Sequence, residues 1–199
     1  MKRLKYYFFY FTIFVSGAVV LIVEILGTRV LAPFYGSTIY VWSSLISVTL
    51  AFLALGYWFG GGLADKRPNI DLLYWIVFIG GLAILLIPSY DKFILIQTDR
   101  FGLRYGPLIS AFIIFAPSLF LFGTISPFAV KMRARTLDHL GVTAGNLYAI
   151  ATFGSLAGGL LAGFYLIPNF SIKFIINLIS LCLFFLFLIW QILISLKEE

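Results

Sequence analysis

A single carboxylate, Glu24, lies deep inside the first of six long apolar stretches of this chain. A carboxylate in hydrocarbon costs about 2.5–3.5 kcal/mol on insertion scales, so a membrane chain retains one where it is paired, hydrated or used. Facing a cavity, Glu24 could bind a cation or exchange a proton. Within a buried ion pair, it would instead fix the packing of the helices. The sequence leaves both interpretations open.

The helical neighbours of Glu24 define which groups it could meet. With 3.6 residues per turn, Glu24 shares a helix face with Gly17 and Thr28. Gly17 would let another helix approach closely, and the Thr28 hydroxyl could donate a hydrogen bond to the carboxylate. Arg29 is about 140° away around the helix, so it is not a simple intrahelical partner at spacing four. The two charges could meet if the helix ended near Gly27, or each could pair across helices.

Small residues form two adjacent rows on the fifth apolar stretch. The rows are Ala151, Ser155, Gly159 and Gly163, and beside them Gly154, Gly158 and Ala162. Small residues at four-residue spacing predict close contact with another helix over the whole length. The partner could be a helix of the same chain, a second copy at a dimer seam, or a moving neighbour. Static packing is the simpler interpretation.

Composition excludes a soluble fold. Hydrophobic residues make up 62% of the chain and charged residues 11%, whereas soluble domains carry about 25% charged residues. The basic residues behind the net charge of +6 are scattered among loops, which argues against nucleic-acid binding. The single cysteine, Cys182, predicts neither a disulfide framework nor a thiolate metal cluster. With no nucleotide fingerprint and no catalytic constellation, we expect no cofactor and no self-contained catalysis.

The apolar stretches predict an all-α membrane protein with six transmembrane helices in one domain, residues 1–199. The predicted helices are 6–27, 40–61, 72–88, 107–130, 145–167 and 172–196, and the longest predicted loop is Ser89–Gly106. With the N-terminus inside, nine basic residues fall on the cytoplasmic side and five on the other. The nine are Lys2, Arg3, Lys5, Lys66, Arg67, Lys131, Arg133, Arg135 and Lys197, and the five are Arg29, Lys92, Arg100, Arg104 and Lys173. This bias predicts that both termini are cytoplasmic.

The turn after the second helix, Gly61-Gly62-Leu63-Ala64-Asp65-Lys66-Arg67, resembles the signature loop of the major facilitator superfamily. That signature has a glycine, three residues, an aspartate and a basic residue; here the later basic positions are replaced by Pro68-Asn69-Ile70-Asp71. The resemblance implies half of a major-facilitator-like fold. It also implies that Asp65, with Lys66 and Arg67, bridges helix ends in one gating state, while Gly61 permits close approach.

Longer stretches resemble the membrane domain of fused spermidine-synthase-like proteins. They are Ser16-Gly17-Ala18, Glu24, Arg29 to Ser37, Trp42, Ala54-Leu55-Gly56, Gly61 to Asp65, Gly123 to Pro127, Gly145 to Ala149, Thr152 to Ser155, Gly158-Gly159, Gly163-Phe164 and Ile167-Pro168. In that family a cytoplasmic aminopropyltransferase-like domain usually follows the membrane part. The resemblance implies that this catalytic domain is missing here, so we expect no enzyme activity and a separate cytosolic partner.

Two functions of different classes follow. The first is a half-transporter in a prokaryotic inner membrane, a parallel homodimer in the lipid bilayer that moves an organic cation such as a polyamine. Its predicted substrate-binding residues are Glu24, Arg29, Trp42, Ser43, Ser47, Tyr148 and Thr152. The second is a membrane anchor that docks a cytosolic aminopropyltransferase-like enzyme on the basic loop 131–135. A membrane enzyme acting on a lipid-soluble substrate is a weaker third interpretation.

Overall fold

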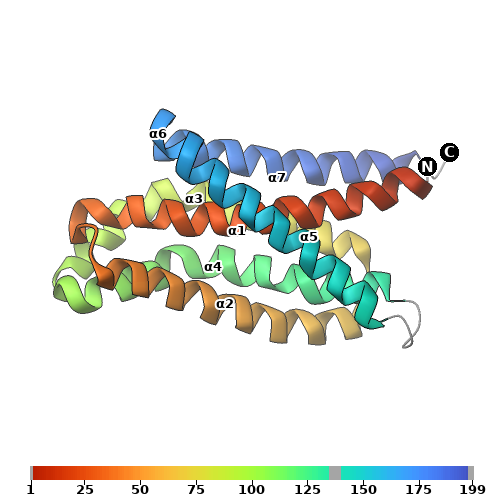
Figure 1. Cartoon of the computed structure of the whole chain (residues 1–199), viewed down its shortest axis with the longest axis horizontal. Coiled ribbons are helices and arrows are strands. Elements are labelled where there is room, and N and C mark those ends of the chain that lie inside the picture. Colours follow the sequence, from red (N-terminus) through yellow and green to blue (C-terminus); the bar gives the residue numbers. More distant parts are fainter. Residues whose placement is uncertain (1, 135–139, 197–199) are drawn as a thin grey trace.

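The structure, a computed structural model, describes residues 2–134 and 140–196. Within these ranges the chain is a bundle of long helices without strands (Figure 1). The elements are α1 (Lys2–Tyr35), α2 (Ile39–Lys66), α3 (Ile70–Asp99), α4 (Gly102–Arg133), α5 (Leu140–Leu161), the π-helical turn η2 (Ala162–Leu166), α6 (Ile167–Asn169) and α7 (Ile172–Ser195). The last turns of the fifth span, η2 and α6, continue α5 without a break.

Of the helices in the described ranges, six are long and apolar enough to cross a membrane, as predicted. A chain in hydrocarbon must satisfy its backbone donors and acceptors internally, which an uninterrupted helix does. The predicted Ser89–Gly106 loop is wrong, because α3 runs through Pro88 to Asp99 and α4 begins at Gly102. The polar residues in this segment had suggested a loop, but a 30-residue helix is about 45 Å long and places them beyond the hydrocarbon.

The first helix is also longer than predicted. It passes Gly27 and ends at Tyr35, so Arg29 lies within a regular helical turn. The helix has 34 residues, or about 51 Å, and extends past both sides of a hydrocarbon core about 30 Å thick. A helix end near Gly27 therefore does not bring Glu24 and Arg29 together.

The helices pack in defined pairs. The most extensive contacts join α2 to α4 and α1 to α5, and α3 lies between α4 and α7. In Figure 1, α5 crosses diagonally over α1, and the N- and C-termini lie at the same end of the bundle. We call this end, where α1 begins and α2, α4 and α7 finish, the terminal end. The other end is the opposite end.

Glycines set the distance between α2 and α4. A Cβ atom on Gly60 would lie 2.6 Å from the Cα of Thr124, and one on Gly123 would lie 2.7 Å from the Leu53 carbonyl oxygen. Real Cβ atoms do not approach backbone this closely, so only glycine permits the contact. The α2–α4 pair therefore has the close backbone approach typical of membrane helices.

A cluster of buried hydroxyls joins three helices near the opposite end. The Tyr35 hydroxyl of α1 lies 2.8 Å from Thr98 Oγ1 of α3 and 3.1 Å from Ser110 Oγ of α4. The Thr98 and Ser110 oxygens are 2.6 Å apart. A Cβ atom on Gly106 would meet the Tyr35 ring at 2.6 Å, so this glycine makes room for the ring. The cluster fixes the end of α1 against α3 and α4.

We expect Tyr35→Phe to lower the free energy of unfolding by about 1 kcal/mol, the net value of an ordinary buried hydrogen bond. The loss is modest because Thr98 and Ser110 still bond to each other and to backbone oxygens. For a protein of this size the unfolding temperature should fall by about 2–4 °C. Thermal unfolding in detergent measures this, with Tyr40→Phe at an exposed tyrosine as the control. Equal unfolding temperatures for the two variants would contradict the assignment.

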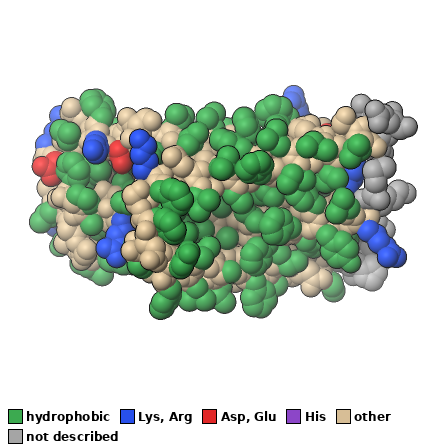
Figure 2. All heavy atoms as spheres, turned by 90° about the horizontal axis from the view of Figure 1, so that it is seen from above, with side chains coloured by type: hydrophobic (Ala, Val, Ile, Leu, Met, Phe, Trp, Pro, Cys, Tyr) green, Lys and Arg blue, Asp and Glu red, His purple; other side chains and the backbone are tan. Residues whose placement is uncertain are grey.

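Figure 2 shows apolar side chains over the long middle of one face, with basic side chains toward both ends and acidic ones plain toward one of them. This distribution matches a lipid-facing band flanked by two polar margins. Many of the exposed residues are large and apolar, among them Trp58, Phe153 and Phe164. Lipid contact accounts for their exposure.

Candidate functional site: a polar cavity between α1, α2, α4 and α5

A cavity of about 140 Å³ lies inside the bundle between four helices. Its wall consists of Ile13, Ser16, Gly17 and Val20 from α1, Leu53 and Tyr57 from α2, Phe122, Ile125 and Ser126 from α4, and Tyr148, Ala151, Thr152 and Ser155 from α5. Four hydroxyl side chains and two tyrosines are thus collected within an apolar bundle. The helix pairing explains the collection, because α1–α5 and α2–α4 contacts bring these faces together.

The hydroxyls of the wall are oriented by the backbone. Ser16 donates to the Thr12 carbonyl at 2.8 Å, Thr152 to the Tyr148 carbonyl at 2.8 Å, and Ser155 to the Gly17 carbonyl at 2.9 Å. A hydroxyl that has given its hydrogen to a carbonyl keeps acceptor lone pairs for a ligand. Such a wall suits a ligand that brings N–H donors, and the tyrosine rings can add cation–π attraction.

Glu24 lies one helical turn beyond this cavity. Val20 is part of the wall, and Glu24 follows it on the same face of α1, about 6 Å further along the axis. The side chain is half-buried, and Thr49 of α2 faces it. No hydrogen bond of ordinary geometry joins the two, since Thr49 Oγ1 is buried without a partner in the described part of the chain. The carboxylate thus adjoins the cavity and is not one of its lining residues.

Neither partner predicted for Glu24 engages it. Thr28 donates its hydroxyl hydrogen to the Ile25 carbonyl at 2.7 Å. Arg29 is exposed and borders a hollow at the opposite end of the bundle. Within residues 2–134 and 140–196 there is one ion pair, between Lys131 and Asp65. The buried Glu24–Arg29 pair that would have made Glu24 structural is therefore not formed.

The structure divides the other predicted substrate-binding residues into two groups. Tyr148 and Thr152 border the cavity. Trp42, Ser43 and Ser47 are exposed on α2 and lie outside its wall. The spacing of the two serines predicted a shared face correctly, but that face points away from α1 and α4. Periodicity alone could not say which face of α2 is covered.

The seam between α1 and α5 is built on glycines. A Cβ atom on Gly17 would meet the Ala151 carbonyl, and one on Gly154 would meet the Phe14 carbonyl. A Cβ atom on Gly158 would lie 2.5 Å from the Ala18 carbonyl oxygen. At all three positions a Cβ atom would be too close to the backbone of the facing helix, so the backbones of α1 and α5 are in contact. The Ser155 hydrogen bond to Gly17 adds a polar link to the same seam.

Contact does not extend along the whole of the predicted rows. At Gly159 a Cβ atom would meet only the flexible side chain of Leu21, at 2.6 Å. At Gly163, within η2, it would meet nothing within 4 Å. Contact between α5 and α1 within the chain therefore ends before Gly163, because the two helices diverge toward the opposite end and the π-helical turn shifts the helical register.

The predicted signature turn forms an ion pair at the terminal end. Lys131 Nζ of α4 lies 2.6 Å from Asp65 Oδ1 of α2. Lys66 and Arg67 are exposed and take no part in it, and a Cβ atom on Gly61 would meet Pro127 at an ordinary 3.9 Å. The two side chains are 47% and 69% exposed, so the pair contributes at most about 1 kcal/mol. It links the ends of α2 and α4.

Three lining residues with hydroxyl groups were not predicted from the sequence: Ser16, Tyr57 and Ser126. Ser16 and Ser126 lie in stretches that resemble the spermidine-synthase-like membrane domain, beside a glycine and a proline. Their polarity inside apolar runs was the available signal.

Comparison with family models, curated proteins and solved structures gave no match. The class of the protein follows from its own residues: an integral membrane protein with six apolar spans and an internal polar cavity. Across the described ranges, no three histidine, cysteine or carboxylate side chains are placed to hold a metal ion.

Proposed function

We propose that this chain is one half of a transporter for a small organic cation such as a polyamine, and that it works as a parallel homodimer. The observation that carries the proposal is the hydroxyl- and tyrosine-lined cavity beside an unpaired intramembrane carboxylate. Intramembrane carboxylates typically mark ion or substrate pathways. A cation with several N–H donors matches both the free hydroxyl lone pairs and Glu24.

The pairing of the helices supports a repeat-based transporter. The two most extensive contacts each join a span of the first half to a span of the second half, since α1 packs on α5 and α2 packs on α4. Because each half has an odd number of spans, the two halves have opposite orientations in the membrane, as in inverted-repeat transporters. In such proteins the substrate site lies near the midplane, where the repeats meet.

The small size of the cavity supports the proposal that two copies of the chain form the substrate site together. Its volume of about 140 Å³ is below the 300–1,000 Å³ of ordinary ligand pockets. Tyr57, Tyr148 and Thr152 on its wall are also exposed, so the wall reaches the surface of the protomer. A parallel dimer that covers this rim would join two cavities and two Glu24 carboxylates, with the terminal ends in the cytoplasm.

The test is uptake of labelled spermidine into proteoliposomes. We expect uptake well above that of empty liposomes, and about a tenfold reduction for Thr152→Val, which replaces the hydroxyl by a methyl group of similar size. Ser47→Ala, which removes an exposed hydroxyl outside the cavity, should leave uptake unchanged. Absence of uptake by a folded, dimeric wild type would overturn the proposal and favour the anchor for a cytosolic enzyme.

A further inference from the structure

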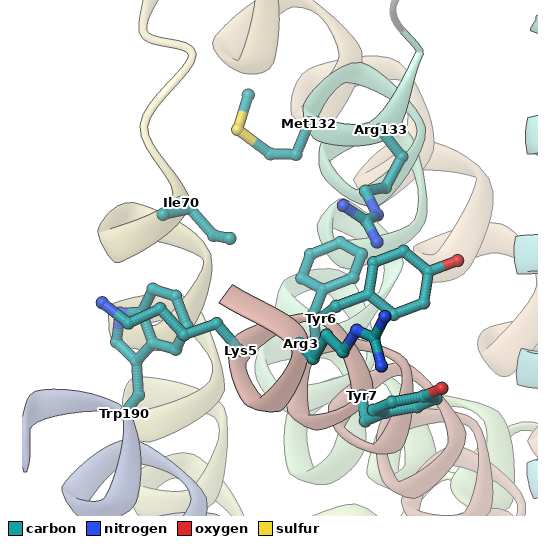
Figure 3. Close-up of a pocket in the computed structure, with 9 residues that line it drawn as sticks. Arg3, Lys5, Tyr6, Tyr7, Ile70, Met132, Arg133 and Trp190 are labelled. Atoms are coloured by element: carbon teal, nitrogen blue, oxygen red, sulfur yellow. The ribbon is translucent and has the colours of Figure 1, made fainter. Parts of the chain in front are cut away.

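A wide hollow opens at the terminal end, between the start of α1 and the ends of α4 and α7 (Figure 3). Its volume is about 870 Å³. Its wall combines three cationic and four aromatic side chains: Arg3, Lys5, Arg133, Tyr6, Tyr7, Phe9 and Trp190. None of its described lining residues is a carboxylate. We call it the terminal pocket.

Two of the three cations of the terminal pocket, Lys5 and Arg133, lie over aromatic rings. The Arg133 guanidinium carbon lies 4.0 Å from the centre of the Tyr6 ring and 5.1 Å from that of Tyr10. The Lys5 ammonium lies 5.8 Å from the centre of the Trp190 ring. Such contacts orient a cation but leave its charge uncompensated. One Arg133 guanidinium nitrogen is buried with no hydrogen-bond partner in the described structure.

Two carboxylates of the described ranges at this end already have partners. Asp71 accepts a hydrogen bond from Trp190 Nε1 at 2.8 Å, and Asp65 is paired with Lys131. The described lining residues therefore carry three positive charges and no negative one. An anionic ligand would supply the missing partner, and a phosphate fits two guanidinium groups and an ammonium.

The position of the pocket favours a lipid over a soluble anion. It lies at the end of four long apolar helices, where tyrosine and tryptophan mark the level of the headgroups. An exposed apolar stripe of Leu4, Tyr7 and Phe11 leads from it along α1 toward the middle of the bundle. These residues follow at three- and four-residue spacing, so they share one face of the helix. Acyl chains could lie along this stripe.

From this charge, geometry and position we propose that the terminal pocket binds the phosphate headgroup of an anionic phospholipid, with Arg3, Lys5 and Arg133 as its ligands. Basic pockets between transmembrane helices bind such headgroups. The site is separate from the internal cavity, so the inference stands whether or not the protein transports a cation.

The experiment is native mass spectrometry of the full chain in mild detergent, titrated with phosphatidylglycerol or with phosphatidylcholine of the same acyl chains. We expect the anionic lipid to be retained at least tenfold more tightly. Each basic residue near a membrane surface contributes about fivefold, so Arg3→Gln with Lys5→Gln should weaken phosphatidylglycerol binding about 25-fold. The matched control is Arg29→Gln, beside the 790 Å³ hollow at the opposite end, and it should change nothing.

Arg133→Gln tests the third ligand, and Arg133→Lys keeps the charge if the glutamine variant fails to fold. The lysine variant should retain most of the preference for phosphatidylglycerol. Equal retention of both lipids, or an equal effect of the Arg29 control, would overturn the proposal. Inorganic phosphate and glycerol phosphate provide the soluble arm: displacement of the lipid by either at millimolar concentration would assign the pocket to a free phosphate instead.

Discussion

Replacing Gly154 with leucine is expected to prevent stable folding. Gly154 lies where α5 touches the backbone of α1, and even a Cβ atom would collide with the Phe14 carbonyl. Backbone atoms cannot move aside as a side chain can, so the two helices would have to separate. Overpacking of a relaxed core costs about 1–3 kcal/mol, and this rigid contact should cost more. Separation would also break the Ser155–Gly17 hydrogen bond and open the wall of the cavity.

Thermal unfolding and size-exclusion chromatography in detergent measure the effect. The matched control is Gly163→Leu, in the same span but with nothing within 4 Å of the added Cβ atom. Its unfolding temperature should stay close to that of the wild type. Gly159→Leu should fall between the two, because it meets only the side chain of Leu21. An unfolding temperature of Gly154→Leu equal to that of the wild type would contradict the close backbone contact between α1 and α5.

The ranking of these three glycines shows what a sequence pattern can and cannot predict. Four-residue spacing of small residues predicted close helix contact on the fifth span, and Gly154 and Gly158 provide it. It could not locate the point at which α5 diverges from α1, since crossing geometry depends on both helices. Gly163 therefore carried the same sequence signal as Gly159 but has no contact.

The number of spans could be predicted because hydrocarbon allows few alternatives to a helix. The ends of the helices could not be predicted in the same way, because polar residues allow a helix to continue into the headgroup region. The helix α3 does this, since it runs past Asp91 to Asp99. Charge and proline had marked that segment as a loop.

Only some of the residues of the candidate site could be predicted from the sequence. Tyr148 and Thr152 lie on the cavity, whereas Trp42, Ser43 and Ser47 do not. A lipid-facing hydroxyl and a cavity-facing hydroxyl look alike in sequence, because either can donate to its own helix backbone. Only the packing of α2 on α4 and of α5 on α1 separates them.

Replacing Glu24 with glutamine is expected to reduce spermidine uptake about 100-fold. Glutamine keeps the shape of the side chain and removes the negative charge, and a hydrogen-bonded contact to a charged group is worth about 1.5–3 kcal/mol. The measurement is the proteoliposome uptake assay. Asp99→Asn makes the same chemical change at an exposed position at the end of α3 and should leave uptake unaltered.

The stability of Glu24→Gln separates a functional carboxylate from a structural one. If Glu24 held the bundle through an ion pair, its neutralisation would leave a buried partner charge and destabilise the protein by several kcal/mol. The described structure has no such pair, and Thr49 alone faces the carboxylate without a standard hydrogen bond. Removing an uncompensated charge from a half-buried site should therefore raise the unfolding temperature while uptake falls. If Glu24→Gln lost both stability and uptake, the result would indicate that Glu24 has a structural role. A gain in stability with loss of uptake would mean that the chain keeps this carboxylate at a cost in folding because its function requires it.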